Sequence, residues 1–201
     1  MKTKIYLFFS LSILFLFISS SCSAYITTEV FQKYPNPIFV ETGSFNGDGI
    51  DKALEAGFRE IHSIELSPTL YHYCCQRFEG NPHVHLYLGD SSKVLKKVLS
   101  KINRPITFWL DGHYSWAGTA RGDTNTPLLN ELAIIARHPI KTHTILINDV
   151  RQFGTIEFDF IEKMDAVLAL KKINPDYKIS YENGYIPNDV LVASFKNTKS
   201  K

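Results

Sequence analysis

The sequence predicts an α/β fold, in which an open, mostly parallel, Rossmann-like sheet of seven strands carries helices on both faces and ends in a C-terminal antiparallel hairpin. Three observations lead to this prediction. Short apolar runs alternate with helix-like segments five times along the chain, as in repeated strand–helix units. Two further β-rich runs flank Asn183-Gly184, a turn signal between antiparallel strands. With 201 residues, 44% of them apolar, the chain is long enough to bury a sizeable core.

Each of the first three units begins with an apolar strand and continues into a helix with a recognisable end or start. The first helix stops at Gly57, because glycine accepts the left-handed backbone that ends many helices. The second begins at Ser67-Pro68, a capping serine followed by a proline in the first turn. Ser91 opens the third helix. We expect strands at residues 38–41, 60–66 and 84–88, and helices at residues 49–56, 67–78 and 91–102.

The second half of the chain keeps this order but has longer connections. The fourth strand ends at Asp111, and a polar loop leads to Thr126-Pro127, which starts a helix. The fifth strand ends in Asn148-Asp149, and the periodicity after it predicts a long amphipathic helix. We expect strands at residues 106–110, 144–147, 178–181 and 190–195, and helices at residues 126–138 and 156–172.

The first 24 residues have the features of a secretory signal peptide. Two lysines precede an almost wholly apolar run, residues 5–18, and small residues follow it. The run is shorter than the roughly 20 residues of a membrane-spanning helix. Cys22 and Ala24 suit cleavage before Tyr25, which we rank above lipidation at Cys22 and above an uncleaved anchor. We therefore expect a signal peptide or N-terminal anchor that directs the protein into the secretory pathway.

Without this leader the chain has no net charge. The leader holds two of the 22 basic residues, so residues 25–201 carry 20 basic and 20 acidic residues. A nucleic-acid-binding protein would show a basic excess or a basic stripe. We expect a single exported or membrane-anchored domain at residues 25–201, no nucleic-acid partner, and membrane contact only through residues 1–24 where they stay attached. The sequence leaves a cytoplasmic location and the oligomeric state open.

An acidic residue follows each of the five parallel strands. These residues are Glu41, Glu65, Asp90, Asp111 and the pair Asn148-Asp149. In open α/β sheets, ligands bind beyond the carboxyl ends of the strands. Any one of these acids is equally well explained as a helix cap. Five in succession predict a binding site at one rim of the sheet.

The spacing of these residues suits a ligand that contains a nucleoside. The turn from Gly43 to Gly47 exposes backbone N–H groups at a helix start, where a carboxylate or phosphate binds. Glu65 follows the acid of the first strand by 24 residues, close to the spacing of roughly 20 at which an acid binds both ribose hydroxyls. Asp90 with Ser91 matches an adenine edge. Because the glycines lack the G-x-G-x-x-G spacing, a nicotinamide cofactor fits less well than another adenosine ligand.

Together these motifs resemble the class I S-adenosylmethionine-dependent methyltransferases, over roughly residues 36–196. The residues that carry the resemblance are Glu41-x-Gly43-x-x-x-Gly47, Glu65, Gly89-Asp90, Asp111 and the terminal hairpin. The E-x-G-x-x-x-G form and the acidic pair after the fifth strand are most similar to the metal-dependent small-molecule O-methyltransferases of catechol, caffeoyl-CoA and macrocin type.

The resemblance implies a cofactor role for each strand end. Glu41 would hold the methionine amine, Glu65 would take the ribose, and Asp90 would frame the adenine. The cofactor-binding residues that it implies are Glu41, Thr42, Gly43, Ser44, Phe45, Gly47, Glu65, Leu66, Gly89, Asp90, Ser91 and Asp111.

The resemblance also implies a metal site. The predicted catalytic residues are Asp111, His113 and Asp149. Asp111, Asn148 and Asp149 stand where the metal-dependent branch places the ligands of an ion such as Mg²⁺, which would lower the pKa of an acceptor hydroxyl. The chain departs from the catechol pattern, because Asn precedes Asp and no lysine for catalysis is evident. In the absence of a metal, His113 is the candidate general base, and a solvated loop histidine is the alternative.

The loop at residues 111–124 is unusual, with three glycines, two aromatic residues and one arginine. We expect a lid over the substrate, in which Tyr114 and Trp116 pack on the acceptor and Arg121 contacts an acidic group. The alternative is an ordinary connection whose aromatic side chains cover the edge of the sheet.

The predicted function is methyl transfer from S-adenosylmethionine to a hydroxyl of a small molecule, assisted by a divalent metal. The export signal conflicts with it, because S-adenosylmethionine is made in the cytosol. The first alternative is therefore an exported, catalytically inactive domain of this fold that binds adenosine or another small molecule. A metal-dependent hydrolase built on Asp111, His113 and Asp149 is a more distant alternative.

Overall fold

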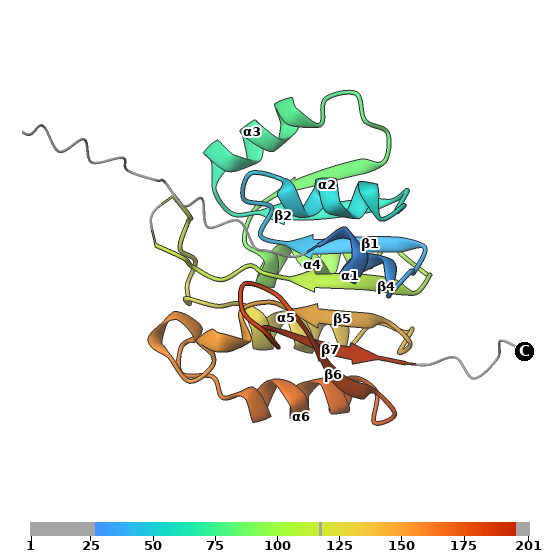
Figure 1. The fold of residues 1–201 in the computed structure, drawn as a ribbon. Coiled ribbons are helices and arrows are strands. Elements are labelled where there is room, and N and C mark those ends of the chain that lie inside the picture. The colour runs from blue at the N-terminus through green and yellow to red at the C-terminus, as the bar shows by residue number, and fades with distance from the viewer. Residues whose placement is uncertain (1–26, 117, 196–201) are drawn as a thin grey trace, which may run out of the picture.

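Seven strands form one sheet in the order β3-β2-β1-β4-β5-β7-β6. The computed structural model describes residues 27–116 and 118–195 (Figure 1). Strands β1 to β5 are parallel, and β7 is antiparallel to both of its neighbours, β5 and β6. The strands are β1 Ile38–Thr42, β2 Ile61–Glu65, β3 Val84–Leu88, β4 Ile106–Leu110, β5 Thr144–Ile147, β6 Lys178–Glu182 and β7 Val190–Ser194. The predicted fold class, a mostly parallel seven-stranded sheet with a C-terminal antiparallel hairpin, is confirmed.

Helices cover both faces of the sheet, and Figure 1 shows α3 and α6 at its opposite ends. They are α1 Thr28–Gln32, α2 Asp48–Glu55, α3 Pro68–Arg77, α4 Ser91–Leu99, α5 Leu128–Ile135 and α6 Lys163–Ile173, with the 3₁₀ turns η1 Val150–Gln152 and η2 Ile156–Phe158. Helices α4, α5 and α6 pack on one face, where Leu95 and Leu132 meet Phe108. Helices α1, α2 and α3 pack on the other, where Phe31 and Trp109 are buried.

Burial on both faces explains why the central strands are apolar without alternation. Every residue of β1, β2, β4 and β5 is buried, as expected of parallel strands between two helical layers. Strand β3 lies at the edge of the sheet and is only partly buried. The two cores therefore hold the ends of β1, β2, β4 and β5 in fixed positions at one rim. In Figure 1 the arrowheads of β1, β4 and β5 point to the same side.

The helix predicted at residues 156–172 begins too early. The structure has the short turn η2 at Ile156–Phe158 and starts α6 only at Lys163. Glu162 caps α6, and its side chain and that of Asp165 satisfy each other's backbone N–H groups in a capping box.

Between η2 and α6, the chain takes a left-handed conformation that no helix contains. Asp159 and Phe160 have φ angles of 50° and 57°. The Asp159 carboxylate accepts hydrogen bonds from the backbone N–H groups of Asn125 and Thr126, at 2.8 and 3.0 Å. These bonds to a distant loop favour the left-handed conformation over the helix that local periodicity predicted.

Two further differences concern helix ends. The helix predicted at residues 126–138 covers only Leu128–Ile135, because the chain turns after Ala136 and His138 binds the carbonyl of Ile102. The short helix α1 was not predicted, although its Val30 and Phe31 are buried.

The signal peptide predicted at residues 1–24 lies outside the described residues and stays a prediction, together with the secretory location. In the part of the chain that the structure describes, no helix is long and apolar enough to cross a membrane.

Candidate active site

The turn after β1 brings the chain against the end of β4. Gly43 has a φ of +83°, and a Cβ added to it would lie 2.5 Å from the backbone oxygen of Asp111. Gly47, with a φ of +89°, is the N-cap residue of α2. Both positions therefore need glycine, and the close approach at Gly43 places the turn beside the acidic residue at the end of β4.

Glu41 lies beneath this turn, almost fully buried. The Ser63 hydroxyl donates to its Oε2 at 2.5 Å, and a Cβ on Gly49 would lie 1.9 Å from its Oε1. Burial, assisted by the charges of Asp111 and Glu65, raises the pKa of Glu41 to about 8, although the Ser63 hydrogen bond opposes the shift. The carboxyl group is thus mostly neutral at pH 7, and a cationic ligand would ionise it.

Glu65, at the end of β2, fixes the turn after β1. Its Oε2 accepts the backbone N–H of Phe45 at 2.9 Å, and its Oε1 accepts that of Ser67 at 2.8 Å. The backbone N–H groups of Leu66 and Ser44 also interact with this carboxylate. Burial raises the pKa of Glu65 even though these N–H groups oppose the shift.

Asp90 and Ser91 start α4 at the same rim. Asp90 is the N-cap residue, and its Oδ1 accepts from the backbone and the hydroxyl of Ser92, at 2.9 and 2.7 Å. The Ser91 hydroxyl donates to Glu131 at 2.5 Å.

Glu131 is a buried acid that the sequence analysis missed. It lies on α5, 1% exposed, and burial raises its pKa to about 7 while the Ser91 hydrogen bond opposes the shift. Its only sequence signal is an acid on the apolar face that Leu128, Leu132 and Ile135 form.

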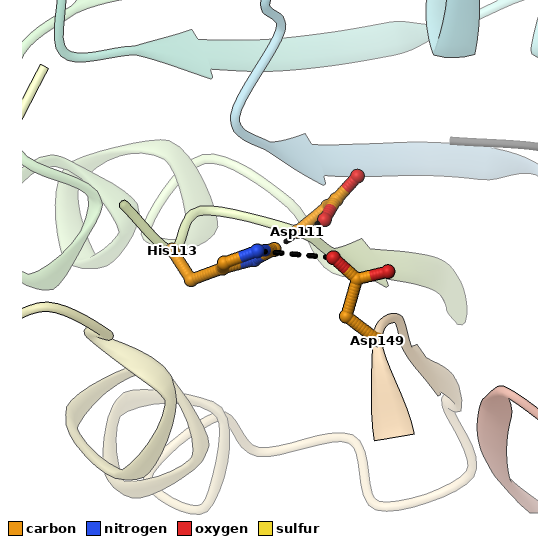
Figure 2. Close-up of side chains that lie close together, drawn as sticks. All are labelled: Asp111, His113 and Asp149. Carbon is orange, nitrogen blue, oxygen red and sulfur yellow. Dashed lines mark ion pairs between the residues drawn. The ribbon is translucent and has the colours of Figure 1, made fainter. Parts of the chain in front are cut away.

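Asp111, His113 and Asp149 form one cluster at the ends of β4 and β5. In Figure 2 dashed lines mark the ion pairs between the His113 ring and the two carboxylates. Its Nε2 lies 3.0 Å from Asp149 Oδ2 and its Nδ1 lies 3.5 Å from Asp111 Oδ1. The Ser115 hydroxyl is 2.8 Å from Nε2, and the ring packs on Phe158. His113 is therefore held in place and buried, and the alternative of a solvated loop histidine does not describe it.

The two carboxylates determine the protonation of His113. Burial alone would lower its pKa, but Asp111 and Asp149 outweigh burial and raise the pKa to about 9. Burial also opposes ionisation of Asp149, yet His113 and Arg151 lower its pKa. At neutral pH His113 thus keeps its proton, and it can act as a general base only after losing it.

The cluster offers donor atoms for a metal ion. Asp111, His113 and Asp149 each supply one ligand atom within 4.8 Å of the others. The side chain of Asn148 hydrogen-bonds Asp111 and lines the same opening. Two carboxylates suit Mg²⁺ or Mn²⁺, whereas an imidazole nitrogen suits Zn²⁺ or Mn²⁺ better than Mg²⁺. The residues therefore fit a divalent ion, and His113, which the sequence placed in a metal site only in the hydrolase alternative, offers a third donor atom.

Arg151 and Asp189 were also not predicted as site residues. Arg151 Nη1 donates to Asp149 Oδ1 at 2.6 Å and to Asp189 Oδ2. Asp189 comes from the loop between β6 and β7, and Tyr185 of the same loop lies under the guanidinium, 5.0 Å from ring centroid to Arg151 Cζ. No local pattern marks this contact, because it joins segments 38 positions apart in the chain.

One cleft gathers most of the predicted residues. Of these, its lining includes Glu41, Gly43, Ser44, Phe45, Glu65, Leu66, Gly89, Asp90, Ser91, Asp111, His113, Asn148 and Asp149. Thr42 and Gly47 do not line it. The Thr42 hydroxyl is buried beside Gly112 without a hydrogen bond of good geometry among the described residues, and Gly47 turns the chain into α2.

The loop after β4 covers part of this cleft. Tyr114, Ser115 and the segment at residues 122–125 line the cleft. The Trp116 side chain, 63% exposed, and Arg121, which is also exposed, lie outside the lining. Of the three residues expected to contact the acceptor, only Tyr114 is therefore in a position to do so in this conformation.

Comparison with known proteins rests on structure. No protein-family model matches the sequence, and no curated protein is similar to it. A methyltransferase of Podospora anserina, bound to S-adenosylhomocysteine (SAH), matches with a TM-score of 0.56 and 15% identity over 85% of this chain and 76% of that chain. An O-methyltransferase of Bacillus cereus in complex with SAH matches with a TM-score of 0.55 and 13% identity, over 84% and 78%. This chain has the class I methyltransferase fold.

The methyltransferase fold alone does not determine which group is transferred. A spermidine synthase of Thermotoga maritima matches with a TM-score of 0.54 and 12% identity, over 85% of this chain and 57% of that chain. Since one fold serves several reactions, the activity of this chain has to be argued from its cleft.

Proposed function

We propose that this protein transfers the methyl group of S-adenosylmethionine to a hydroxyl of a small molecule. One observation carries the proposal: the acids at the ends of β1, β2 and β3 open into the same cleft as the cluster of Asp111, His113 and Asp149. The cleft thus offers a place for an adenosine ligand directly beside a group of titratable side chains. The SAH-bound structures of the same fold support this reading.

The lining of the cleft fits the cofactor. Glu65 lines the cleft at the end of β2, where its carboxylate would accept the ribose hydroxyls. The buried Glu41 would ionise beside a positively charged amine, and Gly43 leaves open the space that a Cβ would fill. When bound, S-adenosylmethionine supplies an activated methyl group on a sulfonium, which departs as a neutral thioether.

In this proposal the chain itself orients the acceptor and controls one proton. Methylation forms a carbon–oxygen bond, breaks a carbon–sulfur bond and releases the hydroxyl proton. His113, which lines the cleft and has its Nε2 3.0 Å from Asp149, receives that proton once it has lost its own. Asp111 and Asp149 fix the ring so that its nitrogen stays in position.

We include a divalent cation in the proposal. Asp111, Asn148 and Asp149 would hold it, and when bound it would supply Lewis acidity to the acceptor hydroxyl, whereas His113 is the base where no metal is bound. Calorimetric titration with Mn²⁺ and Mg²⁺ is expected to give a binding heat that Asp149→Asn abolishes. Unchanged binding in that variant would remove the metal from the proposal.

Calorimetry of the purified protein with S-adenosylmethionine and SAH tests the proposed function. Both ligands are expected to bind, and Glu65→Ala is expected to weaken binding by about tenfold or more, because two hydrogen bonds to a charged group are lost. Glu79→Ala, an exposed acid in the turn after α3, is the matched control. Absence of binding would sink the proposal.

Transfer of a labelled methyl group to a library of small hydroxyl compounds then separates an active enzyme from a binding domain. Label is expected in at least one acceptor. Tight SAH binding without transfer to any compound would favour the alternative of an inactive adenosine-binding domain.

A further inference from the structure

We propose that Arg151 binds a carboxylate of the methyl acceptor, so that the acceptor is a hydroxy acid. This inference rests on the proposed function and deepens it, because it names a substrate class for the same cleft. It is carried by the way in which Arg151 is held, by the hydrogen-bond donors that remain on it, and by its distance from the catalytic cluster.

A fully buried acid, Asp189, holds Arg151 in place. Asp189 Oδ1 accepts the backbone N–H of Arg151 at 3.0 Å, and Asp189 Oδ2 accepts Nη1 of the side chain. The Asp189 backbone oxygen also accepts the N–H of Val150 at 2.8 Å. The Asp189 side chain is 0% exposed, so its charge serves Arg151 and not a ligand. A guanidinium that is fixed in advance loses little entropy when it binds an acid.

The other edge of the guanidinium remains available. Both side-chain hydrogen bonds of Arg151 use Nη1, which also donates to Asp149 Oδ1 at 2.6 Å. Nε and Nη2, with three N–H donors between them, have no hydrogen-bond partner within residues 27–116 and 118–195. Arg151 lines the cleft, and its side chain is 24% exposed. The N–H groups of Nε and Nη2 lie side by side on one edge of the guanidinium, and such a pair of donors matches the two oxygens of a carboxylate.

Tyr185 strengthens the site on one face of the guanidinium. Its ring lies 5.0 Å from Arg151 Cζ and shares the cleft lining. The aromatic ring keeps water from that face, and hydrogen bonds from a partly desolvated guanidinium to an anion are stronger than those in open water.

Distance within the cluster limits where the carboxylate lies relative to the reacting hydroxyl. Arg151 and His113 contact opposite oxygens of the same Asp149 carboxylate, at 2.6 and 3.0 Å. An acceptor whose carboxylate meets Arg151 therefore has its hydroxyl next to His113 when the two groups are only a few bonds apart. A short aliphatic or an ortho-substituted aromatic hydroxy acid satisfies this geometry.

The local charge decides between a carboxylate and a more highly charged group. Asp111, Asp149 and Asp189 surround the cations His113 and Arg151. A dianionic phosphate close to three carboxylates would be repelled more strongly than a monoanion. The sequence analysis assigned this contact with an acid to Arg121 of the loop, which is exposed and outside the cleft.

The test compares salicylate, phenol and phenyl phosphate by calorimetry, on the protein saturated with SAH and on the protein without it. Salicylate is expected to bind the wild type at least about tenfold more tightly than phenol and more tightly than phenyl phosphate. Arg151→Gln is expected to remove this preference while phenol binding stays the same. Arg151→Lys keeps the charge but loses the paired N–H donors. Its preference for salicylate over phenol is expected to lie between those of the wild type and Arg151→Gln. Asp189→Asn, which removes the charge that holds Arg151 in place, is also expected to weaken salicylate binding.

Arg104→Gln is the matched control, since Arg104 pairs with Glu60 at the surface and does not line the cleft. SAH affinity and the unfolding temperature, measured for every variant, show whether it is folded. Absence of salicylate binding, equal affinity for salicylate and phenol, or an unchanged preference in a folded Arg151→Gln variant overturns the inference. If phenyl phosphate binds more tightly than salicylate, the preferred group is a phosphate and not a carboxylate, which also overturns the inference. Because SAH binding is measured separately, its absence counts against the proposed function alone.

Discussion

Gly43 marks the closest approach between β1 and β4. Replacement by alanine forces a side chain into a φ of +83° and places its Cβ 2.5 Å from a backbone oxygen that cannot move aside. The left-handed backbone costs about 1–2 kcal/mol and the overlap adds about 1–3 kcal/mol. We expect Gly43→Ala to lower the free energy of unfolding by about 3 kcal/mol in urea titrations.

Gly80 provides the matched control for this prediction. It also has a positive φ, +75°, but a Cβ added to it meets nothing within 4 Å. Gly80→Ala is expected to cost only the conformational part, about 1–2 kcal/mol. Equal losses in the two variants would show that the contact with β4 is not tight.

The raised pKa of His113 predicts how the rate of methyl transfer depends on pH. Asp111 and Asp149 raise this pKa to about 9, so the fraction of the ring that can accept a proton grows tenfold per pH unit below that value. With the best acceptor from the library, the rate is expected to rise up to about pH 9. The pH–rate profile of Asp149→Asn is expected to rise at lower pH, because one of the two charges is gone.

A divalent cation would shift the pH–rate profile to lower pH, as the Asp149→Asn substitution does. If it binds Asp111 and Asp149, adding Mn²⁺ is expected to move the rise of the profile to lower pH. A rate independent of pH between 6 and 9 would contradict the role of His113 as a base.

Some residues of the cleft could be predicted from the sequence, and others could not. Acids at the ends of parallel strands could be predicted because strand order alone sends them to one rim, as Glu65 and Asp90 show. Arg151 was expected only to pair with Asp149, because its anchor Asp189 follows it by 38 positions and no periodicity connects the two. Glu131 shows a third case, because a buried acid on an apolar helix face reveals its partner only after the helices have packed.

At the scale of elements, a pair of buried histidines links the loops that enter β4 and β5. The backbone N–H of Ile106 donates to His143 Nδ1 at 3.1 Å, so His143 carries its proton on Nε2 and donates it to His138 Nδ1 at 3.0 Å. His138 in turn donates from Nε2 to the carbonyl of Ile102 at 2.9 Å. The chain of bonds is complete only when both rings are neutral.

This pair predicts a loss of stability in mild acid. Burial, with the nearby His138 and Lys141, lowers the pKa of His143 to about 3. The unfolded chain takes up this proton below pH 6.5 and the folded chain does not, so stability falls as pH decreases from about 6.5 toward 3. Between pH 7 and pH 5 this group is expected to cost about 2 kcal/mol of unfolding free energy.

Urea titrations at the two pH values test this expectation against His143→Gln. Glu41 and Glu131, whose raised pKa values favour the folded state at lower pH, are present in both proteins and cancel in the comparison. The wild type is expected to lose more stability than the variant. An equal loss in both would show that His143 does not titrate in this way.

Helix ends were the least predictable part of the elements. Apolar periodicity continued through residues 156–162, yet Asp159 binds the N–H groups of Asn125 and Thr126 instead of forming a helix. Such a contact depends on a loop more than 30 positions away, so a local pattern cannot contain it. The strands were predicted well because burial on both faces left them continuous in apolar residues.

At the scale of the whole molecule, the single domain predicted at residues 25–201 has its own test. One sheet carries both cores, with Trp109 buried in one of them and Trp116 exposed in the loop after β4. We expect one unfolding transition, with coincident midpoints for tryptophan fluorescence and far-ultraviolet circular dichroism. Two separate midpoints would show that the chain divides into independent units.

Fold class was predictable because five repeated units and a terminal hairpin leave few ways to arrange a sheet. The position of β7 between β5 and β6 was not, since sequence shows that two strands form a hairpin but not which of them joins the parallel part.

The position of β7 has a consequence for synthesis of the chain on the ribosome. Strand β7 is Val190–Ser194, the last in chain order of the strands within residues 27–195, yet it supplies the partner that covers the free edge of β5. During translation, every shorter nascent chain therefore presents β5 with an unpaired row of backbone groups, a surface that pairs readily with other chains. The sheet closes only after these last strand residues have left the exit tunnel, so stalled or truncated products of this protein are expected to aggregate or to occupy chaperones.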